Sequence, residues 1–304
     1  MISLRYHLVT IVAVFLALAV GLLAGSAFVE PGLVDQLRTQ TDNLRDQVRE
    51  LEGSLTEARA EIDALDGFVD AALPYLTQDR LLGRSAVVVA QEGVEDALIG
   101  QTQRALADAG ADVVAVISAR DVIASQDPET QARLADLLGV PAAPAEDLPA
   151  LTASALAARI ANGDPSSEVE DDLLAQLLSD GFLAPIGSGL SEGTLERVGE
   201  EGQVVVVLGG GPEEEPAVPP EAFLVPLVEE LAVLDLPLAA GESTSSPVGF
   251  VEPIRGLDGI VTVDDLDLSI GGAALVLGLD RLLDTGQGGA YGIEDGADPL
   301  PPAS

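Results

Sequence analysis

The pattern of hydrophobic positions divides the chain into three parts, and the first is an unbroken apolar segment near the N-terminus. Residues from Leu8 to Val29 include no charged side chain. At about 1.5 Å per residue, a helix of this length spans the roughly 30 Å hydrocarbon core of a bilayer. The segment predicts a transmembrane helix, so that residues 1–30 form a cytoplasmic stub and a membrane anchor.

Charges on the two sides of this segment predict its direction. Arg5 precedes it, whereas Glu30 and Asp35 follow it, and positive residues favour the cytoplasmic side of a membrane. We expect a single-pass plasma-membrane protein with a cytoplasmic N-terminus and an extracytoplasmic domain in the cell envelope. A cleaved signal peptide is the alternative, because Gly25 to Ala27 are small. The apolar run exceeds the usual hydrophobic region of about 7–15 residues, which favours the anchor.

The second part, residues 33–73, carries a heptad pattern that predicts a coiled coil. Two interleaved series of positions recur every seven residues and correspond to a and d of a heptad. The a series is Val34, Thr41, Val48, Leu55, Ile62 and Val69, and the d series is Leu37, Leu44, Leu51, Ala58, Leu65 and Ala72. The proposed interaction residues are Val34, Leu37, Leu44, Val48, Leu51, Leu55, Ile62, Leu65 and Val69.

A single helix cannot bury a seam of this length by itself. We therefore expect either a homodimer or a partner helix along the coiled coil. The alternative is an amphipathic helix that packs against its own domain. Pro74 is expected to end the helix, because proline lacks the N–H that a helix interior requires.

The third part, residues 84–285, alternates between short β-branched runs and helical patterns. Strands are expected at Ala86–Ala90, Val113–Ile117, Val204–Leu208 and Leu236–Ala240, with helices between and after them. Continuous apolar strands indicate a sheet that is covered on both faces. The sequence predicts a three-layer α/β domain with a mostly parallel sheet. Residues 286–304, rich in Gly, Asp and Pro, are expected to form an irregular acidic tail.

Composition narrows the function further. The chain has 51 acidic and 14 basic residues, a formal net charge of -37, no cysteine, one histidine and one methionine. Such a surface repels phosphate backbones, which disfavours nucleic acid as a partner. Soft copper sites need Cys, Met or His, and the only ones are Met1 and His7. We therefore assign no metal ligand and no cofactor.

Several short motifs suggest chemistry, but each lacks a required group. The segment from Gly189 to Gly193 places Ser191 as in a nucleophile elbow, yet its base would have to be a histidine or lysine. The only histidine is His7, and the chain has no lysine. We expect no catalytic residue, and a serine hydrolase remains the weakest alternative.

Two other features have simpler explanations than a ligand site. The glycines at 209–211 are followed by three glutamates instead of the lysine of a phosphate-binding loop, so a solvated loop is expected. Acidic clusters at Asp264, Asp265 and Asp267 and at Glu294, Asp295 and Asp298 lack calcium-loop spacing. Turn and helix-capping roles are expected for them.

The N-terminal sequence MISLRYHLVTIVAVFLALAVGLLAGS, the coiled coil, the segment Thr262–Asp265 and the segment Gly288–Gly292 resemble the actinobacterial MctB-like family. That family is labelled a copper transporter or copper-transport outer-membrane protein family. The resemblance implies a role in copper transport or homeostasis. Its relatives include SteB, which is associated with cell division and with a peptidoglycan hydrolase.

We expect a non-enzymatic envelope protein with the family's copper-related role, acting as an interaction scaffold. The alternative is a division scaffold that recruits or regulates a peptidoglycan hydrolase through its coiled coil. The expected partners are the lipid bilayer along residues 8–29, a second copy or a partner helix along the coiled coil, and an envelope or division protein.

Overall fold

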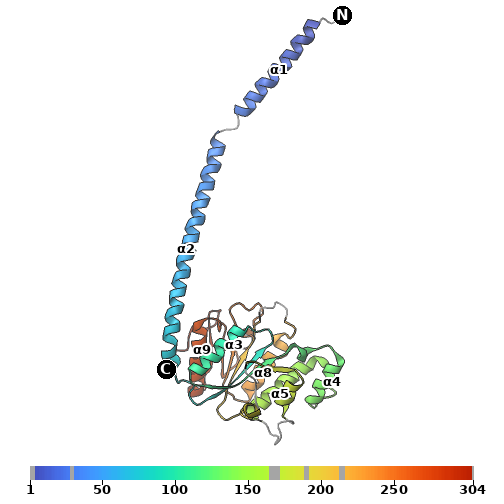
Figure 1. The fold of residues 1–304 in the computed structure, drawn as a ribbon, viewed down its shortest axis with the longest axis vertical. Coiled ribbons are helices and arrows are strands. Elements are labelled where there is room, and N and C mark those ends of the chain that lie inside the picture. The colour runs from blue at the N-terminus through green and yellow to red at the C-terminus, as the bar shows by residue number, and fades with distance from the viewer. Residues whose placement is uncertain (1–3, 28–30, 164–171, 188–191, 212–215, 303–304) are drawn as a thin grey trace. The chain divides into compact units, whose positions relative to one another are not determined.

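The computed structural model describes residues 4–27, 31–163, 172–187, 192–211 and 216–302 (Figure 1). The chain divides into two compact units, Met1–Leu65 and Asp66–Ser304. The first unit contains α1 (Leu4–Ala27) and most of α2 (Pro31–Thr77). The second unit begins within α2 and contains the α/β domain.

α2 is one continuous helix that has a proline at its first residue and another within its last turn. Pro31 begins the helix, where the absence of an N–H has no cost. Pro74 lies inside the helix, which continues to Thr77, so the expectation that Pro74 ends it was wrong. Proline removes one helical hydrogen bond because it has no N–H. The Gln78 N–H still donates to the Pro74 carbonyl at 3.0 Å.

The described residues of the second unit build a seven-stranded sheet in the order β3-β2-β1-β4-β5-β6-β7. Its strands are β1 (Ser85–Gln91), β2 (Asp112–Ala119), β3 (Leu183–Pro185), β4 (Val204–Leu208), β5 (Leu238–Gly241), β6 (Ile260–Val263) and β7 (Gly289–Tyr291). All neighbouring strands are parallel except β2 and β3, which are antiparallel. The strand order reverses direction between β1 and β4, which is the point where an open α/β sheet is expected to hold a ligand.

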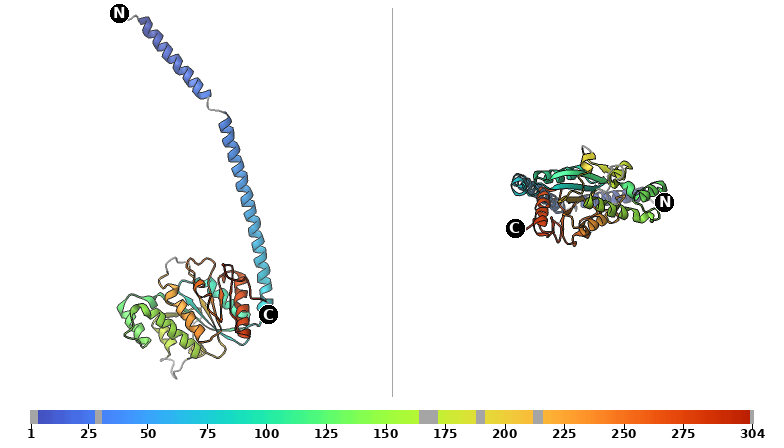
Figure 2. Two further views of the ribbon diagram at one scale, coloured as in Figure 1. Left: turned by 180° about the vertical axis from the view of Figure 1, so that it is seen from behind. Right: turned by 90° about the horizontal axis from the view of Figure 1, so that it is seen from below.

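Helices cover both faces of the sheet. One core lies beneath α4 (Pro128–Leu137), α5 (Leu148–Asn162), α6 (Leu173–Ser179) and α8 (Leu224–Val233). The other core lies beneath α3 (Asp96–Asp108) and α9 (Ser269–Thr285). In Figure 1, the red helix α9 lies at the left end of the domain and the green helices α4 and α5 lie toward its right end; Figure 2 shows the same arrangement from behind.

Strand β1 shows why the buried strands are apolar without alternation. Val87 and Val89 pack into the core beneath α5 and α8. Ala86, Val88 and Ala90 pack into the core beneath α3 and α9. Successive side chains of a strand point to opposite faces, so a strand with a core on each side needs apolar residues throughout. The predicted α/β class and mostly parallel sheet are confirmed.

Three strands were missed. β3, β6 and β7 have only three or four residues each, too few to show a period. β7 lies in the segment from Gly286 that was expected to be irregular, so that expectation was wrong. The tail folds back on this strand, because the Asp298 N–H donates to the Ala290 carbonyl at 2.9 Å.

Candidate functional site

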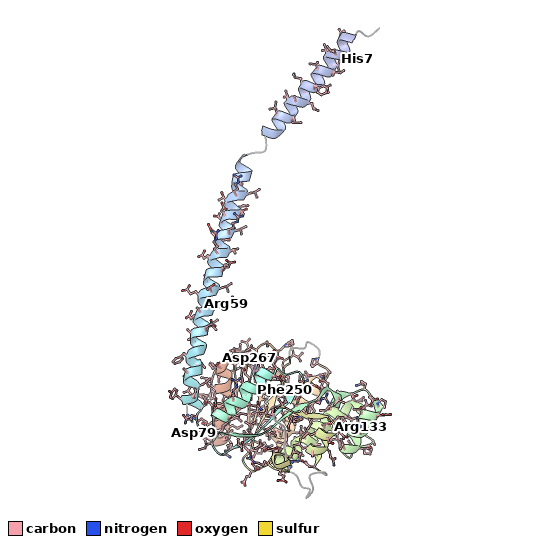
Figure 3. The ribbon with its side chains drawn as sticks, viewed as in Figure 1. His7, Arg59, Asp79, Arg133, Phe250 and Asp267 are labelled. Atoms are coloured by element: carbon pink, nitrogen blue, oxygen red, sulfur yellow. The ribbon has the colours of Figure 1, made fainter. Side chains whose placement is uncertain are left out.

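The heptad seam is an apolar stripe along α2 that is exposed within the first unit. In the first unit, the seam side chains are between 51 % and 64 % exposed. They are Leu37, Leu44, Val48, Leu51, Leu55, Ile62 and Leu65. Val69, in the second unit, is partly buried, and the side chain of Val34 lies outside those that the structure describes. Charged side chains such as Arg59 flank the stripe (Figure 3).

α1 is the second exposed apolar surface. Tyr6–Gly25 has a mean hydropathy of 2.7, and none of it is buried by the rest of the protein. An exposed apolar helix of this length matches the thickness of a bilayer. His7, the only histidine, lies in α1 (Figure 3), far in sequence from every acidic cluster of the second unit.

The carboxyl edge of the sheet is where a ligand site is expected in this fold. In open α/β sheets, ligands bind beyond the carboxyl ends of the strands where the strand order reverses. Here that point lies between β1 and β4, next to Gln91 and the glycines at 209–211.

This position is filled by the protein. The crevice lined by Gln91, Gly210 and Val248 has a volume of about 20 Å³, whereas small-molecule sites occupy about 300–1,000 Å³. The Gln91 side-chain amide donates to the Val218 carbonyl across it. A Cβ on Gly209 would lie 2.6 Å from the ring of Phe250. The glycines permit close packing of two loops, instead of the solvated loop that the sequence suggested.

Glu242 is the most unusual group at this edge. It follows β5 and is almost completely buried. Its carboxylate accepts hydrogen bonds from the N–H groups of Phe250 at 2.6 Å and Val251 at 3.3 Å. The pKa of Glu242 is raised to about 7, chiefly by burial; the two N–H groups oppose this rise and the carboxylates of Glu294 and Asp264 contribute to it. Glu242 therefore fixes the loop that follows β5.

Asp264 joins the end of β6 to the C-terminal segment. Its carboxylate accepts hydrogen bonds from Arg255 Nη2 at 2.7 Å and from the Ile293 N–H at 2.8 Å. Arg255 also contacts Glu294 at 3.0 Å. Gly292 has φ +136°, and a Cβ there would collide with the Asp264 carboxylate. The two segments that carry the family resemblance therefore meet at this contact.

The other two aspartates of the cluster have separate environments. Asp267 accepts hydrogen bonds from the N–H and the hydroxyl of Thr244, both at 2.7 Å. Asp265 is buried, and its Oδ1 has no hydrogen-bond partner. The pKa of Asp265 is raised to about 6, chiefly by burial and in part by the charges of Asp264 and Asp267. Among the described residues, no group of three acidic or histidine side chains is arranged to hold a metal ion.

The sequence did not single out Glu242 or Arg255. Neither has a neighbour in the chain that marks it as special, since their partners come from other segments. Ser191, the candidate nucleophile, lies outside the described residues. The part of its motif that is described belongs to the short helix α7 (Glu192–Leu195).

Comparison with known proteins decides the family. The family model for "Copper transport outer membrane protein, MctB" matches residues 1–302. The chain belongs to the MctB family. It is 28 % identical over 335 positions to the copper transporter MctB of Mycobacterium tuberculosis, and the match covers 98 % of each chain. The copper transporter MctB of Mycobacterium leprae is 26 % identical over 325 positions, again with 98 % of each chain covered.

These relatives agree with the resemblance drawn from the N-terminal and C-terminal segments. They are named as transporters and not as enzymes. The family name, together with the exposed apolar helix α1, indicates a copper-related protein of the membrane or cell envelope.

Proposed function

We propose that this chain is a membrane-anchored, non-catalytic scaffold that serves copper homeostasis in the cell envelope and acts as a pair of copies joined through α2. The family match along nearly the whole chain supports the copper-related role. The uncovered stripe on α2 is the single observation that carries the scaffold role, because seven large apolar side chains remain exposed on one helix.

The lack of Cu(I)-binding side chains after the membrane anchor indicates that a partner, and not this chain, binds the copper. After Glu30 the sequence contains no cysteine, histidine or methionine, and these are the side chains that bind Cu(I). The carboxylates that cluster at the sheet edge, Asp264 and Asp267, already accept hydrogen bonds from the chain itself. A scaffold that positions a copper-handling partner needs no ligand of its own.

The seam composition favours a parallel pair. Position a carries β-branched residues at five of its six occurrences, Leu55 being the exception, and position d carries leucine at four of six. This combination favours two-stranded parallel coiled coils. Two anchors inserted in one membrane in the same direction also bring their α2 helices together in parallel.

The direction of insertion follows from the flanking charges. Arg5 lies before the apolar helix, and Glu30 and Asp35 lie after it. Positive residues stay in the cytoplasm, so the α/β domain lies on the extracytoplasmic side. A strongly acidic surface there is poorly suited to binding anionic headgroups, which leaves α1 as the attachment to lipid.

A complementation experiment tests the proposal. A strain without this gene is transformed with the natural gene, with Leu51→Glu/Leu55→Glu, or with Asn43→Glu/Thr56→Glu. The first double variant places charge in the seam, and the second places the same charge at heptad positions c and b, outside the seam. Growth in added copper and cellular copper content are measured.

We expect the deletion strain to be copper-sensitive, and the natural gene and the Asn43→Glu/Thr56→Glu control to restore tolerance. The seam variant should fail to do so at equal protein abundance. Normal copper tolerance in the deletion strain would refute the copper-related role. Full rescue by the seam variant would refute the role of pairing.

A division scaffold is the second candidate, and the same stripe favours it, because a long helical seam suits docking of another coiled coil. It predicts that a fluorescent fusion of the protein gathers at division septa and that the Leu51→Glu/Leu55→Glu variant loses a peptidoglycan hydrolase partner. A uniform envelope distribution with normal septation would exclude it.

A further inference from the structure

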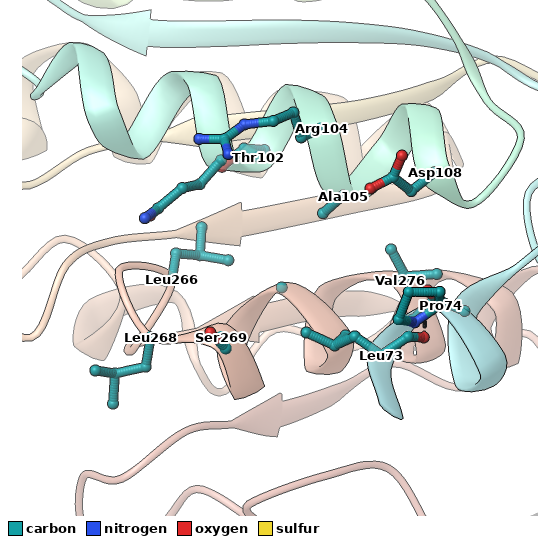
Figure 4. A pocket seen from close by; sticks show the side chains of 13 residues that line it. Leu73, Pro74, Thr102, Arg104, Ala105, Asp108, Leu266, Leu268, Ser269 and Val276 are labelled. Carbon is teal, nitrogen blue, oxygen red and sulfur yellow. Dashed lines mark hydrogen bonds between the residues drawn. The ribbon is translucent and has the colours of Figure 1, made fainter. Parts of the chain in front are cut away.

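A cleft in the second unit lies between the last turns of α2, helix α3 and helix α9. It has a volume of about 420 Å³. Leu73 and Thr77 line it from α2, Ala105 from α3, and Leu268 and Val276 from the segment that begins and forms α9 (Figure 4). The lining is apolar at Leu73, Ala105, Leu268 and Val276 and polar at Thr77, Thr102, Arg104 and Asp108, so an aromatic side chain entering the cleft would meet both apolar and polar groups.

The end of α2 differs from the rest of the helix at the heptad positions called g, which flank the seam. After Leu33 at the start of the coil, the g positions of the first unit hold the polar residues Gln40, Gln47, Ser54 and Glu61. The next two g positions hold Phe68 and Tyr75, which are 69 % and 88 % exposed. From Gln40 onward, aromatic residues therefore replace polar ones at position g only in the part of α2 that belongs to the second unit.

The position of the cleft on α2 decides which surface these aromatic residues meet. Leu73 occupies position e, on the other flank of the seam from position g. In a parallel two-stranded coil, position g of one helix pairs with position e of the other, five residues further along. Phe68 of one copy therefore pairs with Leu73 of the other, on the flank where the other copy's cleft opens.

We propose that Phe68 of a second copy packs against Leu73 and that Tyr75, one heptad further along the same flank, helps to cover the cleft between α2, α3 and α9, so that each domain is completed by the partner's helix. This inference rests on the proposed pairing through α2. It adds that the partner contributes side chains to a site on the globular domain, which the seam alone does not require.

The area involved is substantial. Phe and Tyr side chains each bury about 150–250 Å², and twofold symmetry brings four of them into the contact. That amounts to roughly 600–1,000 Å² in addition to the seam, where stable interfaces bury about 1,200–2,000 Å² in total. A second copy, related by twofold symmetry, would bury the two exposed aromatic side chains and cover the cleft in the same arrangement.

Photocrosslinking on the full chain in native membranes tests the proposal. Phe68 is replaced by the photoreactive amino acid benzoylphenylalanine, which keeps an aromatic side chain at an exposed position. Gln47, three heptads earlier and also at position g, receives the same replacement as the matched control. After irradiation, products are separated by mass and the attached peptides are sequenced.

We expect the Phe68 variant to yield a product of twice the chain mass, attached to α3 or to the start of α9 of the other chain. The Gln47 variant should attach only to α2. A Phe68 product of single-chain mass, attachment confined to α2, or no product would overturn the covered cleft.

A cysteine at Leu55 separates this outcome from failure of the pairing itself. The chain has no natural cysteine, so Leu55→Cys forms a disulfide only between two copies. Paired a positions bring the two cysteines within disulfide range. If that disulfide forms and Phe68 does not reach α3 or α9, the pair stands and the covered cleft is wrong. If the disulfide does not form, the pairing is wrong and the covered cleft with it.

Discussion

Glu242→Gln should remove a pH dependence that the buried carboxyl group gives to the α/β domain. Burial raises the pKa of Glu242 to about 7 from an ordinary value of 4.5. The folded protein therefore holds a proton on Glu242 between these two pH values, whereas the unfolded chain has released it. Stability from this group is present below about pH 4.5 and falls as pH rises toward 7.

The magnitude follows from the two pKa values. At about 1.36 kcal/mol per pKa unit, the difference between about 7 and 4.5 corresponds to about 3 kcal/mol. Glutamine has no charge to desolvate, and its side-chain oxygen can still accept the Phe250 N–H. The stability of Glu242→Gln relative to the natural protein should therefore rise by about 3 kcal/mol between pH 4.5 and pH 8.

Amide hydrogen exchange against urea measures this in the full chain. Peptides from the central strands β1 and β4 report the unfolding of the globular domain separately from α2. The difference between variant and natural protein isolates Glu242 from Asp265, whose raised pKa acts in the same direction. Glu252→Gln, at an exposed glutamate of the same loop region, is the control and should show no such trend.

A difference between Glu242→Gln and the natural protein that stays constant from pH 4.5 to pH 8 would refute this reasoning. It would mean that Glu242 is ionised in the folded state across that range. The two N–H groups that contact it at 2.6 and 3.3 Å would then outweigh its burial.

Three further predictions follow from other parts of the domain. Arg159→Ala should destabilise it by about 3–5 kcal/mol, because Arg159 is buried against Asp172 at 2.5 Å; a loss below 1 kcal/mol in urea-dependent exchange would contradict this. Gly292→Ala should cost about 1–3 kcal/mol and release the C-terminal segment from Asp264, seen as faster exchange in β7; unchanged exchange would contradict it. The purified full chain should not compete with a Cu(I) chelator, and tight stoichiometric binding would contradict the assignment of copper to a partner.

The α/β class was accessible from the sequence because the central strands are long and apolar on both sides. Val204–Leu208 is an uninterrupted apolar run of four valines and one leucine, and the structure places β4 on the same residues. β6 and β7 were not accessible, because four residues of Ile260–Val263 and three of Gly289–Tyr291 fix no period. They pair with each other although they lie in segments that are distant in the chain.

In the candidate site, too, features that one helix determines could be predicted from the sequence, whereas features that depend on contacts between distant segments could not. The seam of α2 is a local property of one helix, and its exposure was expected from the heptad spacing. The raised pKa of Glu242 depends on how a loop and two other acidic segments fold around it, and nothing near it in the sequence reports this. The filled crevice beside Gln91 likewise depends on Val218 and Phe250 from separate loops.

The mass of the full chain in a mild detergent, measured by native mass spectrometry, tests the proposed pairing most directly. We predict two copies of 31.1 kDa each for the natural protein and for Asn43→Glu/Thr56→Glu, and a single copy for Leu51→Glu/Leu55→Glu. Each leucine removed from water contributes about 1.5–3 kcal/mol, so two charges in the seam should abolish pairing. A natural protein found only as single chains, with the seam amides protected from exchange, would contradict the account.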